Sequence, residues 1–283
     1  MTMQPAVLPT LSVSIVVFRP HLDVVRRTLA SLHDALTQAF ASMVLAEARI
    51  DVIDNGTFDE GELDALVRSE IAPGDRVALR ILRGHGNVGY GRGHNLSLLA
   101  AESTYHLVLN PDVLMAPDAL RAAIEFLGSE PGVGLVAPDV RDARGARQFL
   151  CRRFPTIFVL YLRSFAPGFL RRRFAAHDGR YEMRDVIGDS VFRGHFLTSG
   201  CFMFGRTAIL QRIGGFDPGY FMYFEDYDLS LSLGRYAESA YVPAVRIVHY
   251  GGDASGKGLR HVLMYLRSAF TFYSRHGWRL WRA

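Results

Sequence analysis

The clearest indication of the fold class is the stretch Tyr105-His106-Leu107-Val108-Leu109-Asn110-Pro111-Asp112. In it, an apolar run of strand-forming residues ends in a polar turn. Asn-Pro-Asp is a favourable turn sequence in its own right. It also places two oxygen ligands, from Asn110 and Asp112, directly beyond a buried strand. One or two carboxylates together with substrate phosphates can hold Mg²⁺ or Mn²⁺, so the pattern is compatible with a turn alone or with a cation site.

The residues around this stretch alternate between strand and helix patterns. Further strands are expected at residues 13–18, 50–53, 77–82 and 134–140. Helices are expected at about 24–36, 59–71 and 94–103, and from Pro117, since proline favours the first helical position. Alternation with short connections over about 140 residues predicts βαβ units, a parallel sheet and an α/β fold.

Polar loops follow three of these strands: Asp54-Asn55-Gly56, the glycine-rich segment 84–93, and Asn110-Pro111-Asp112. Parallel sheets bind ligands beyond the carboxyl ends of their strands, so the three loops are predicted to face one crevice. Gly84 to Gly89 matches G-x-G-x-x-G, but it follows the third strand and does not open the first βαβ unit, which argues against a dinucleotide fingerprint. Its glycines either allow close approach to a ligand or form a plain flexible loop.

After residue 140 the alternation stops, and one continuous domain with a more variable second half is expected. The most unusual segment there is Phe221-Met222-Tyr223-Phe224-Glu225-Asp226-Tyr227-Asp228-Leu229, in which three carboxylates follow an aromatic run. A helix is expected from Glu225 to about Tyr236, and acids in its first turn could simply complement the helix dipole. The adjacent aromatic residues favour crowded carboxylates with raised pKa values or a bound cation, which would suit a general base or a metal-linked site.

His249 ends the apolar run 245–248 and precedes a glycine-rich loop. A lone histidine is usually structural or solvated, but this position makes it a candidate metal ligand.

The composition excludes several classes of protein. With 283 residues, 49% of them apolar, the chain can form a full core and is not disordered. The 28 acidic residues offset the 32 basic ones and no RRM, KH or helix-turn-helix signature occurs, so nucleic-acid binding is not expected. Cys151 and Cys201 give no disulfide framework and no metal spacing, which favours a cytoplasmic location. No basic n-region precedes an apolar segment at residues 1–10, and no apolar stretch reaches the ~18 residues of a spanning helix.

Together these segments resemble the inverting family 2 glycosyltransferases with a GT-A fold, over about residues 13–255. The matching stretches are 13–20, 54–56, 87–95, 110–113, 198–203, 214–217, 221–229 and 249–255. The Asn-Pro-Asp-Val and Phe-Met-Tyr-Phe-Glu-Asp forms look most like bacterial rhamnosyltransferases of O-antigen and cell-wall polysaccharide assembly. The resemblance implies one α/β GT-A domain, a Rossmann-like nucleotide-diphospho-sugar transferase with a mixed central sheet, at residues 1–255. Its nucleotide-binding half would span about 11–140 and its acceptor-binding half about 141–255, followed by a helical tail at 256–283.

The resemblance also implies roles for single residues. Asp226 would be the catalytic base, with Glu225 beside it near the acceptor. Asp112 and His249 would hold Mg²⁺ or Mn²⁺, and Asn110 replaces the first Asp of the D-x-D motif. The implied nucleotide-sugar-binding residues are Phe18, Pro20, Asp54, Asn55, Gly89, Arg92, Asn95, Asn110 and Asp112. The implied lining of the donor-sugar and acceptor pocket is Thr198, Ser199, Gly200 and Tyr223.

The implied reaction is transfer of a sugar, L-rhamnose from dTDP-L-rhamnose, to a glycan or lipid-linked glycan acceptor. A galactofuranose or hexosamine donor, or a non-catalytic sugar-nucleotide-binding relative, remain as alternatives. Two positions depart from the family pattern. Arg19 stands where Asn is usual, and Ser232 stands where an Arg usually follows the acidic helix, which puts one diphosphate-side or structural contact in doubt.

The tail at residues 259–281 has a helical pattern and is rich in arginine and aromatic residues. Such a helix could lie on the anionic inner face of the cytoplasmic membrane, which would suit a lipid-linked acceptor. It could equally pack on the domain or form a homo-oligomer contact. The residues concerned are Arg260, Arg267, Arg275, Arg279, Arg282, Tyr265, Phe270, Phe272, Tyr273, Trp278 and Trp281.

Overall fold

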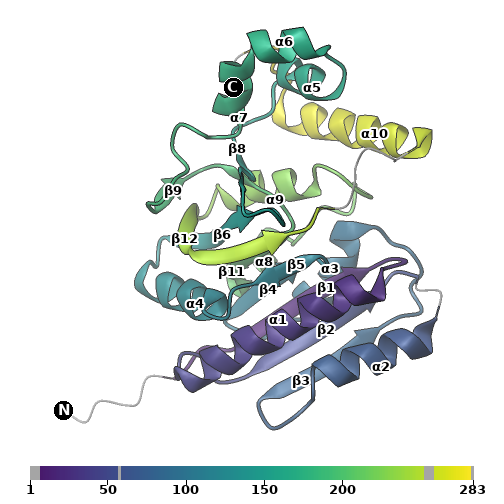
Figure 1. Ribbon diagram of the computed structural model, residues 1–283, viewed down its shortest axis with the longest axis vertical. Helices are drawn as coiled ribbons and strands as arrows, with labels where there is room; N and C mark the ends of the chain where they lie inside the picture. The colour runs from purple at the N-terminus through teal and green to yellow at the C-terminus, as the bar shows by residue number, and fades with distance from the viewer. Residues whose placement is uncertain (1–6, 57–58, 252–257, 282–283) are drawn as a thin grey trace.

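The computed structural model describes residues 7–56, 59–251 and 258–281, and its centre is one mixed sheet (Figure 1). The strands of this sheet are Leu11–Val17 (β1), Ala48–Asp54 (β2), Val77–Leu82 (β3), Tyr105–Leu109 (β4), Val113–Met115 (β5), Val133–Arg141 (β6), Arg147–Gln148 (β7), Phe192–Gly194 (β9), Phe202–Arg206 (β11) and Glu238–His249 (β12). A separate small ladder joins Cys151–Arg152 (β8) to Leu197–Thr198 (β10).

The spatial order of the main sheet is β3-β2-β1-β4-β11-β6-β12-β5, with β7 beside β6 and β9 beside β12. Strands β3, β2, β1 and β4 are parallel, as the alternation predicts. The strand expected at 134–140 (β6) runs in the same direction as these four, but β11 lies between β4 and β6 and is antiparallel to both, so the run of adjacent parallel strands ends at β4. The strand pattern of β11 is visible in the sequence, but its pairing partners are not encoded locally. The sheet is therefore mixed, as the family resemblance implies.

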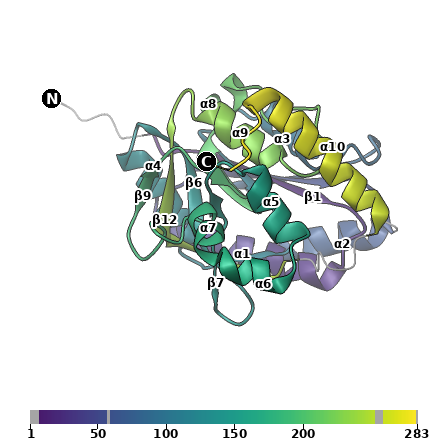
Figure 2. The same cartoon turned by 90° about the horizontal axis from the view of Figure 1, so that it is seen from above.

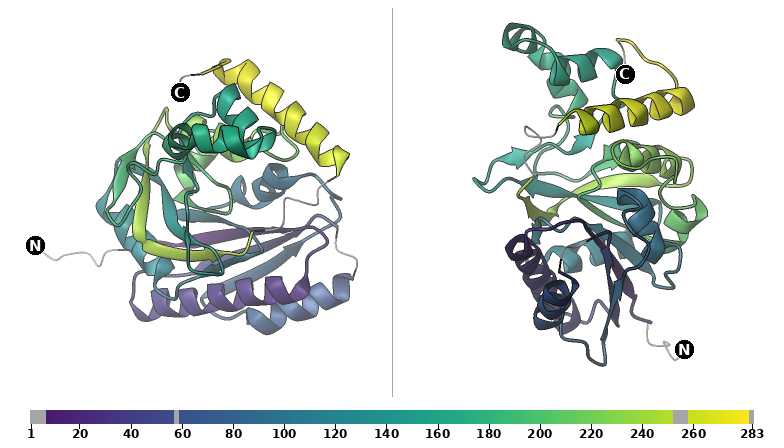
Figure 3. Two further views of the ribbon diagram at one scale, coloured as in Figure 1. Left: turned by 45° about the horizontal axis from the view of Figure 1, so that its top comes forward. Right: turned by 90° about the vertical axis from the view of Figure 1, so that its right-hand side faces the viewer.

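Helices cover both faces of this sheet (Figure 3). They are Leu22–Ala41 (α1), Glu60–Glu70 (α2), Tyr90–Leu98 (α3), Ala119–Ser129 (α4), Ile157–Ser164 (α5), Gly168–Arg173 (α6), Ala175–Tyr181 (α7), Thr207–Arg212 (α8), Glu225–Leu233 (α9) and Leu259–His276 (α10). Helix α3 begins at Tyr90, four residues earlier than expected, and α9 ends at Leu233, three residues earlier than expected. None of the described helices is long and apolar enough to cross a membrane.

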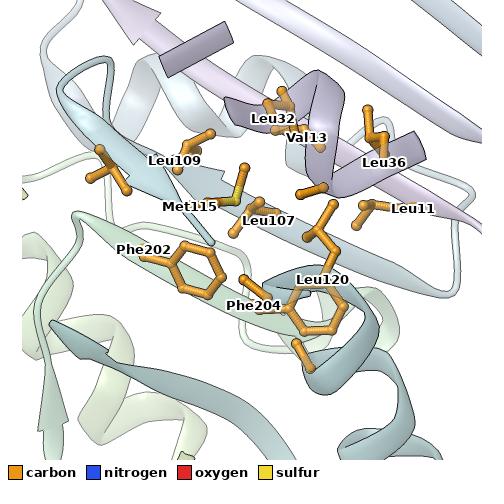
Figure 4. Close-up of a cluster of buried hydrophobic side chains, with 14 of the residues drawn as sticks. Leu11, Val13, Leu32, Leu36, Leu107, Leu109, Met115, Leu120, Phe202 and Phe204 are labelled. Atoms are coloured by element: carbon orange, nitrogen blue, oxygen red, sulfur yellow. The ribbon is translucent and has the colours of Figure 1, made fainter. Parts of the chain in front are cut away.

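The main core lies between the sheet and helices α1 and α4. All seven residues of β1 are buried, as expected for a strand covered on both faces. Figure 4 shows Leu11 and Val13 of β1 in one cluster with Leu32 of α1 and Leu120 of α4. Each fully buried side chain of this size stabilises the fold by roughly 1.5–3 kcal/mol. A second cluster on the opposite face joins α3, α8 and α9 to β4 and β11 through Leu98, Leu210, Leu229, Val108 and Met203.

Helices α5, α6, α7 and α10 lie together at the end of the molecule away from β1–β3 (Figures 1 and 2). Helix α10 packs through Ala269, Phe272 and Tyr273, which are buried against Tyr220 and Phe224. The proposed boundary at residues 255/256, residues 252–255 of the family pattern and Arg282 lie outside the described residues.

Candidate active site

Two neighbouring cavities contain most of the residues singled out from the sequence. The strand-end cavity, about 440 Å³, lies beyond the carboxyl ends of β1, β2 and β4 and is lined by residues that include Phe18, Pro20, Asn55, Asn87, Gly89, Asp112 and Tyr250. The α9 cavity, about 480 Å³, is lined by residues that include Ser199, Gly200, Tyr223, Glu225 and Asp226. Tyr90, Asn110 and Met222 line both cavities, so the two meet at these three residues.

Close packing of the glycine-rich loop brings the two cavities together. Asn55 donates from Nδ2 to the carbonyl oxygen of Gly89 at 2.9 Å, which ties the end of β2 to this loop. Gly89 has φ 89°, and a Cβ there would overlap the backbone of Phe221. The next amide, Tyr90 N–H, donates to the Phe221 carbonyl oxygen at 3.0 Å. The close approach that this glycine permits is therefore to the aromatic run beside the acidic cluster.

Asp112 and His249 come together through a short strand that the sequence did not reveal. Strand β5 pairs antiparallel with the end of β12, with Val113 opposite His249. As a result, His249 Nε2 lies 3.4 Å from Asp112 Oδ1. Burial alone would raise the pKa of Asp112, but the nearby imidazole of His249 and other polar neighbours outweigh burial and hold that pKa below its ordinary value. Asp112 is therefore an anion at neutral pH.

The donor atoms around Asp112 suit a divalent cation. Within the described residues, Asp112 Oδ1, Asn110 Oδ1 and His249 Nδ1 are buried and have no hydrogen-bond partner. Buried polar atoms are rarely left unpartnered, so this cluster is short of a positive or donating group. Oxygen and imidazole nitrogen are ligands that Mn²⁺ accepts, and Mg²⁺ prefers oxygen. No group of three or more His, Cys, Asp or Glu side chains that could hold a metal gathers anywhere in residues 7–56, 59–251 and 258–281, so Asp112 and His249 would be two ligands among others.

The acidic cluster begins helix α9 in an unusual conformation. Tyr223 and Phe224 have φ values of 72° and 66°, in the left-handed region that non-glycine residues rarely adopt. Consecutive residues of this kind cost of order 1–3 kcal/mol each and are typical of functional sites. The turn places Asp226 where its Oδ2 accepts from Gly200 N–H and its Oδ1 from Tyr227 N–H, both at 2.9 Å.

Burial raises the pKa values of both adjacent carboxyl groups. For Asp226, the hydrogen bonds from Gly200 and Tyr227 only partly offset the effect of burial. For Glu225, the neighbouring Asp226 adds to the effect of burial. Glu225 Oε2 has no hydrogen-bond partner among the described residues. Both Asp226 and Glu225 therefore bind a proton more tightly than an exposed carboxylate does.

The third acid of the cluster has a different environment. Asp228 Oδ1 accepts from Tyr220 Oη at 3.2 Å and lies 2.7 Å from His276 Nε2. His276 is the last residue of α10. Asp228 does not line the α9 cavity, and it joins α9 to α10.

Several residues implied by the family resemblance lie outside the two cavities. Arg92 donates to the carbonyl oxygen of Pro218, and the Asn95 amide bonds to both backbone groups of Phe216. Asp54 is buried, and its Oδ1 accepts from Gly56 N–H. Thr198 is buried, and its N–H donates to Ser230 Oγ. These four residues hold the walls in place in the structure, and their contacts with a ligand remain predictions.

Other residues of the α9 cavity escaped the sequence reading. Arg152, Arg163, Tyr181 and Tyr265 line it, and they come from β8, α5, α7 and α10. Residues 141–195 contain several arginines and aromatic residues, but no spacing in the sequence indicates which of these side chains meet.

Comparisons with known proteins identify the family and the fold. No protein-family model matches the chain. The chain is 30% identical over 279 residues to the N-acetylglucosaminyl-diphospho-decaprenol L-rhamnosyltransferase of Mycobacterium tuberculosis, covering 93% of this chain and 83% of that protein. It is 29% identical over 198 residues to rhamnosyltransferase WbbL of Escherichia coli K12, covering 66% of this chain and 71% of that protein.

Solved glycosyltransferase structures share the fold. GalNAc-T7 with UDP, GalNAc and Mn²⁺ superposes with a TM-score of 0.61 at 15% identity, covering 89% of this chain and 45% of that one. A mannosyltransferase from Pyrobaculum calidifontis in complex with GDP-Man and Mn²⁺ gives 0.57 at 15% identity, covering 88% of this chain and 59% of that one. This chain thus spans about half the length of both, and at such identity they show the GT-A fold alone. With the closer sequence relatives, the comparisons show that the chain belongs to the bacterial rhamnosyltransferase-like glycosyltransferases.

Proposed function

We propose that this glycosyltransferase moves L-rhamnose from dTDP-L-rhamnose to a lipid-linked glycan during assembly of a bacterial surface polysaccharide. The observation that carries the proposal is the meeting of two cavities at Tyr90, Asn110 and Met222. Group transfer needs a donor and an acceptor held with their reacting atoms in contact. The strand-end cavity would bind the nucleotide diphosphate and the α9 cavity the acceptor. The names of the relatives, both rhamnosyltransferases, favour the sugar.

Asp226 is the proposed catalytic base. Its carboxylate would take the proton from an acceptor hydroxyl as that oxygen attacks the anomeric carbon of the donor. The bond between the sugar and the diphosphate breaks, and its electron pair leaves with the diphosphate. Attack from the side opposite the leaving group inverts the anomeric centre. Glu225 would lie beside the acceptor.

Asp112 and His249, with Asn110 between the two cavities, would hold a Mg²⁺ or Mn²⁺ ion. Such an ion would neutralise charge on the departing diphosphate. The unpartnered buried oxygens of Asn110 and Asp112 support this assignment. Phe18, Pro20 and Asn55, which also line the strand-end cavity, would contact the nucleotide.

The proposal is tested by a donor panel. Purified protein is incubated with an N-acetylglucosaminyl diphospho-lipid and either dTDP-L-rhamnose, a UDP-galactofuranose or a UDP-hexosamine, with Mg²⁺ or Mn²⁺ and in EDTA. Transfer of rhamnose alone is expected, and EDTA should suppress it. Faster transfer from another donor would show that the enzyme is a glycosyltransferase of the same family with that donor sugar in place of rhamnose. Binding of a donor without transfer to any acceptor would identify a non-catalytic relative, and full activity in EDTA would refute the metal role of Asp112 and His249.

A peripheral position on the inner face of the cytoplasmic membrane is part of the same proposal. Helices α5, α6 and α10 carry large exposed apolar side chains, which include Tyr161, Phe165, Phe169, Leu259, Leu263, Leu266 and Phe270. Exposed arginines accompany them on α6 and α10: Arg171, Arg172, Arg173, Arg260 and Arg267. Apolar side chains with arginines are typical of surfaces that bind anionic membranes. Arg163, Ser164 and Tyr265 of the same helices line the α9 cavity, so a lipid-linked acceptor could enter it from that side.

A further inference from the structure

The α9 cavity has a charged wall that the proposed reaction does not use. Arg152 and Arg163 both line the cavity, and each guanidinium lies 5.6 Å from the ring centre of Tyr181. They come from the consecutive elements β8 and α5, and their guanidiniums meet around one carboxylate. Glu182 Oε1 lies 2.8 Å from Arg163 Nη1 and 3.5 Å from Arg152 Nη2.

Arg152 is buried with few partners for its donors. A guanidinium carries five N–H donors and accepts nothing. Among the hydrogen bonds of the described residues, the Arg152 side chain makes one, from Nη1 to the carbonyl oxygen of Cys151 at 3.3 Å. Its approach to Glu182 is longer than a hydrogen bond normally is. A buried cation with spare donors on a cavity wall indicates an anionic or strongly accepting ligand.

The carboxylate behind these two arginines is shared with a third guanidinium. Arg184, which does not line the cavity, lies 2.5 Å from Glu182 Oε2 through its Nη2. Asp178 adds a second carboxylate at 2.8 Å from Arg163 Nη1. Neither Glu182 nor Asp178 lines the α9 cavity, so on this side the charged groups that face the cavity are the two guanidiniums.

We propose that Arg152 and Arg163 bind a phosphate group of the acceptor, next to the sugar whose hydroxyl faces Asp226. This inference rests on the proposed function of the α9 cavity. Arginine binds phosphate through paired N–H groups, which gives orientation as well as attraction. The acceptor class is thus a glycosyl phosphate or glycosyl diphosphate. The guanidinium pair would anchor the phosphate while Asp226 deprotonates the sugar.

The test compares three acceptors with the same sugar, N-acetylglucosamine, and the same decyl chain, joined by a diphosphate, by a phosphate or directly as a neutral glycoside. For the wild type, kcat/KM for at least one phosphorylated acceptor should exceed that for the neutral glycoside by about tenfold or more, the range of a hydrogen bond to a charged group. In Arg163→Gln this ratio should fall towards one, and Arg163→Lys should give an intermediate ratio. Arg184→Gln is the matched control, because Arg184 also binds Glu182 but does not line the cavity.

Calorimetric binding of the phosphorylated acceptors, without donor, separates this inference from the proposed function. Weaker binding to Arg163→Gln but not to Arg184→Gln would support the phosphate site even if no rhamnose is transferred. Equal use of charged and neutral acceptors by the wild type, or a ratio unchanged in Arg163→Gln, would overturn it. Thermal unfolding of each variant shows whether a loss reflects the site or the fold. The diphosphate and phosphate acceptors distinguish a site for a glycosyl diphosphate from a site for a glycosyl phosphate.

Discussion

Asp226 combines the features expected of a general base: it lines the α9 cavity, and two backbone N–H groups fix its carboxylate. Asp226→Asn should lower kcat by about 10²- to 10⁴-fold, the usual contribution of a positioned base. Donor binding should change little, because Asp226 does not line the strand-end cavity. Rhamnose transfer and calorimetric binding of dTDP measure the two effects. Turnover close to that of the wild type would show that Asp226 is not the base.

The pH dependence of transfer should report the environment of the carboxyl pair. A base acts when deprotonated, so kcat/KM should fall as pH is lowered through its pKa. Because burial raises the pKa of Asp226, this fall should begin at a higher pH than an ordinary aspartate would give. Glu225→Gln should leave this acid limb in place, because burial raises the pKa of Asp226, whereas the charge interaction within the pair raises the pKa of Glu225. A pH–rate profile of wild type and variant measures the limb, and a limb that moves in Glu225→Gln, or one at the pH of an ordinary aspartate in the wild type, would contradict this assignment.

Substitution of Gly89 tests how closely the glycine-rich loop packs against Phe221, where the two cavities meet. Gly89→Ala should destabilise the protein by more than ~2 kcal/mol, since it adds a clash with Phe221 to the usual ~1–2 kcal/mol of a left-handed alanine. Gly86→Ala is the control, because Gly86 also has positive φ but a Cβ there meets nothing within 4 Å. Urea unfolding compares the two. Equal losses would show that backbone conformation alone, and not close packing, requires glycine at position 89.

At the scale of elements, Phe272 and Phe270 of α10 form a natural pair for testing how the tail is held. Phe272 is fully buried against Phe224, with ring centres 5.2 Å apart, while Phe270 is 64% exposed. Phe272→Ala should cost about 3–5 kcal/mol, as large core truncations do, and Phe270→Ala less than about 0.5 kcal/mol. Urea unfolding measures both. A small loss for Phe272→Ala would show that α10 is not part of the cooperative fold.

The elements show which parts of the site the sequence could predict. The strand-to-loop junctions at Asn55 and Asn110 were predictable, because strand periodicity and turn residues are local signals. Strand β5 was missed since three residues give no period, yet its pairing with β12 brings His249 to Asp112. The left-handed turn at Tyr223 and Phe224 was also invisible, because tertiary contacts maintain this conformation against local preference.

At the scale of the whole molecule, the α/β class, the crevice at the strand ends and the family could all be predicted from the sequence. The sequence did not indicate which strand lies next to β4, because that strand, β11, comes about 90 residues further along the chain. No sequence pattern singles out Arg152 or Arg163 as site residues. Their convergence on Glu182 depends on how β8, α5 and α7 pack, which no spacing in the sequence records.

The proposed membrane contact would lie at the end of the molecule formed by α5, α6 and α10 (Figure 1). We expect the protein to float with vesicles that contain anionic phosphatidylglycerol and much less with phosphatidylcholine alone. High salt should weaken this binding, because the arginines contribute electrostatically. Replacing Phe165, Phe169, Leu263 and Phe270 by serine should reduce the bound fraction tenfold or more, since each buried side chain contributes roughly 1.5–3 kcal/mol.

The control for this experiment is Met43→Ser, which removes an exposed apolar side chain from the turn after α1. It should leave flotation unchanged. Surface substitution is preferable to removal of residues 259–283, because deleting α10 would uncover Tyr220 and Phe224. Flotation that is independent of lipid charge or of the four substitutions would refute the membrane contact. Concentration-dependent self-association lost in the same variant would instead assign this face to a contact between copies of the chain.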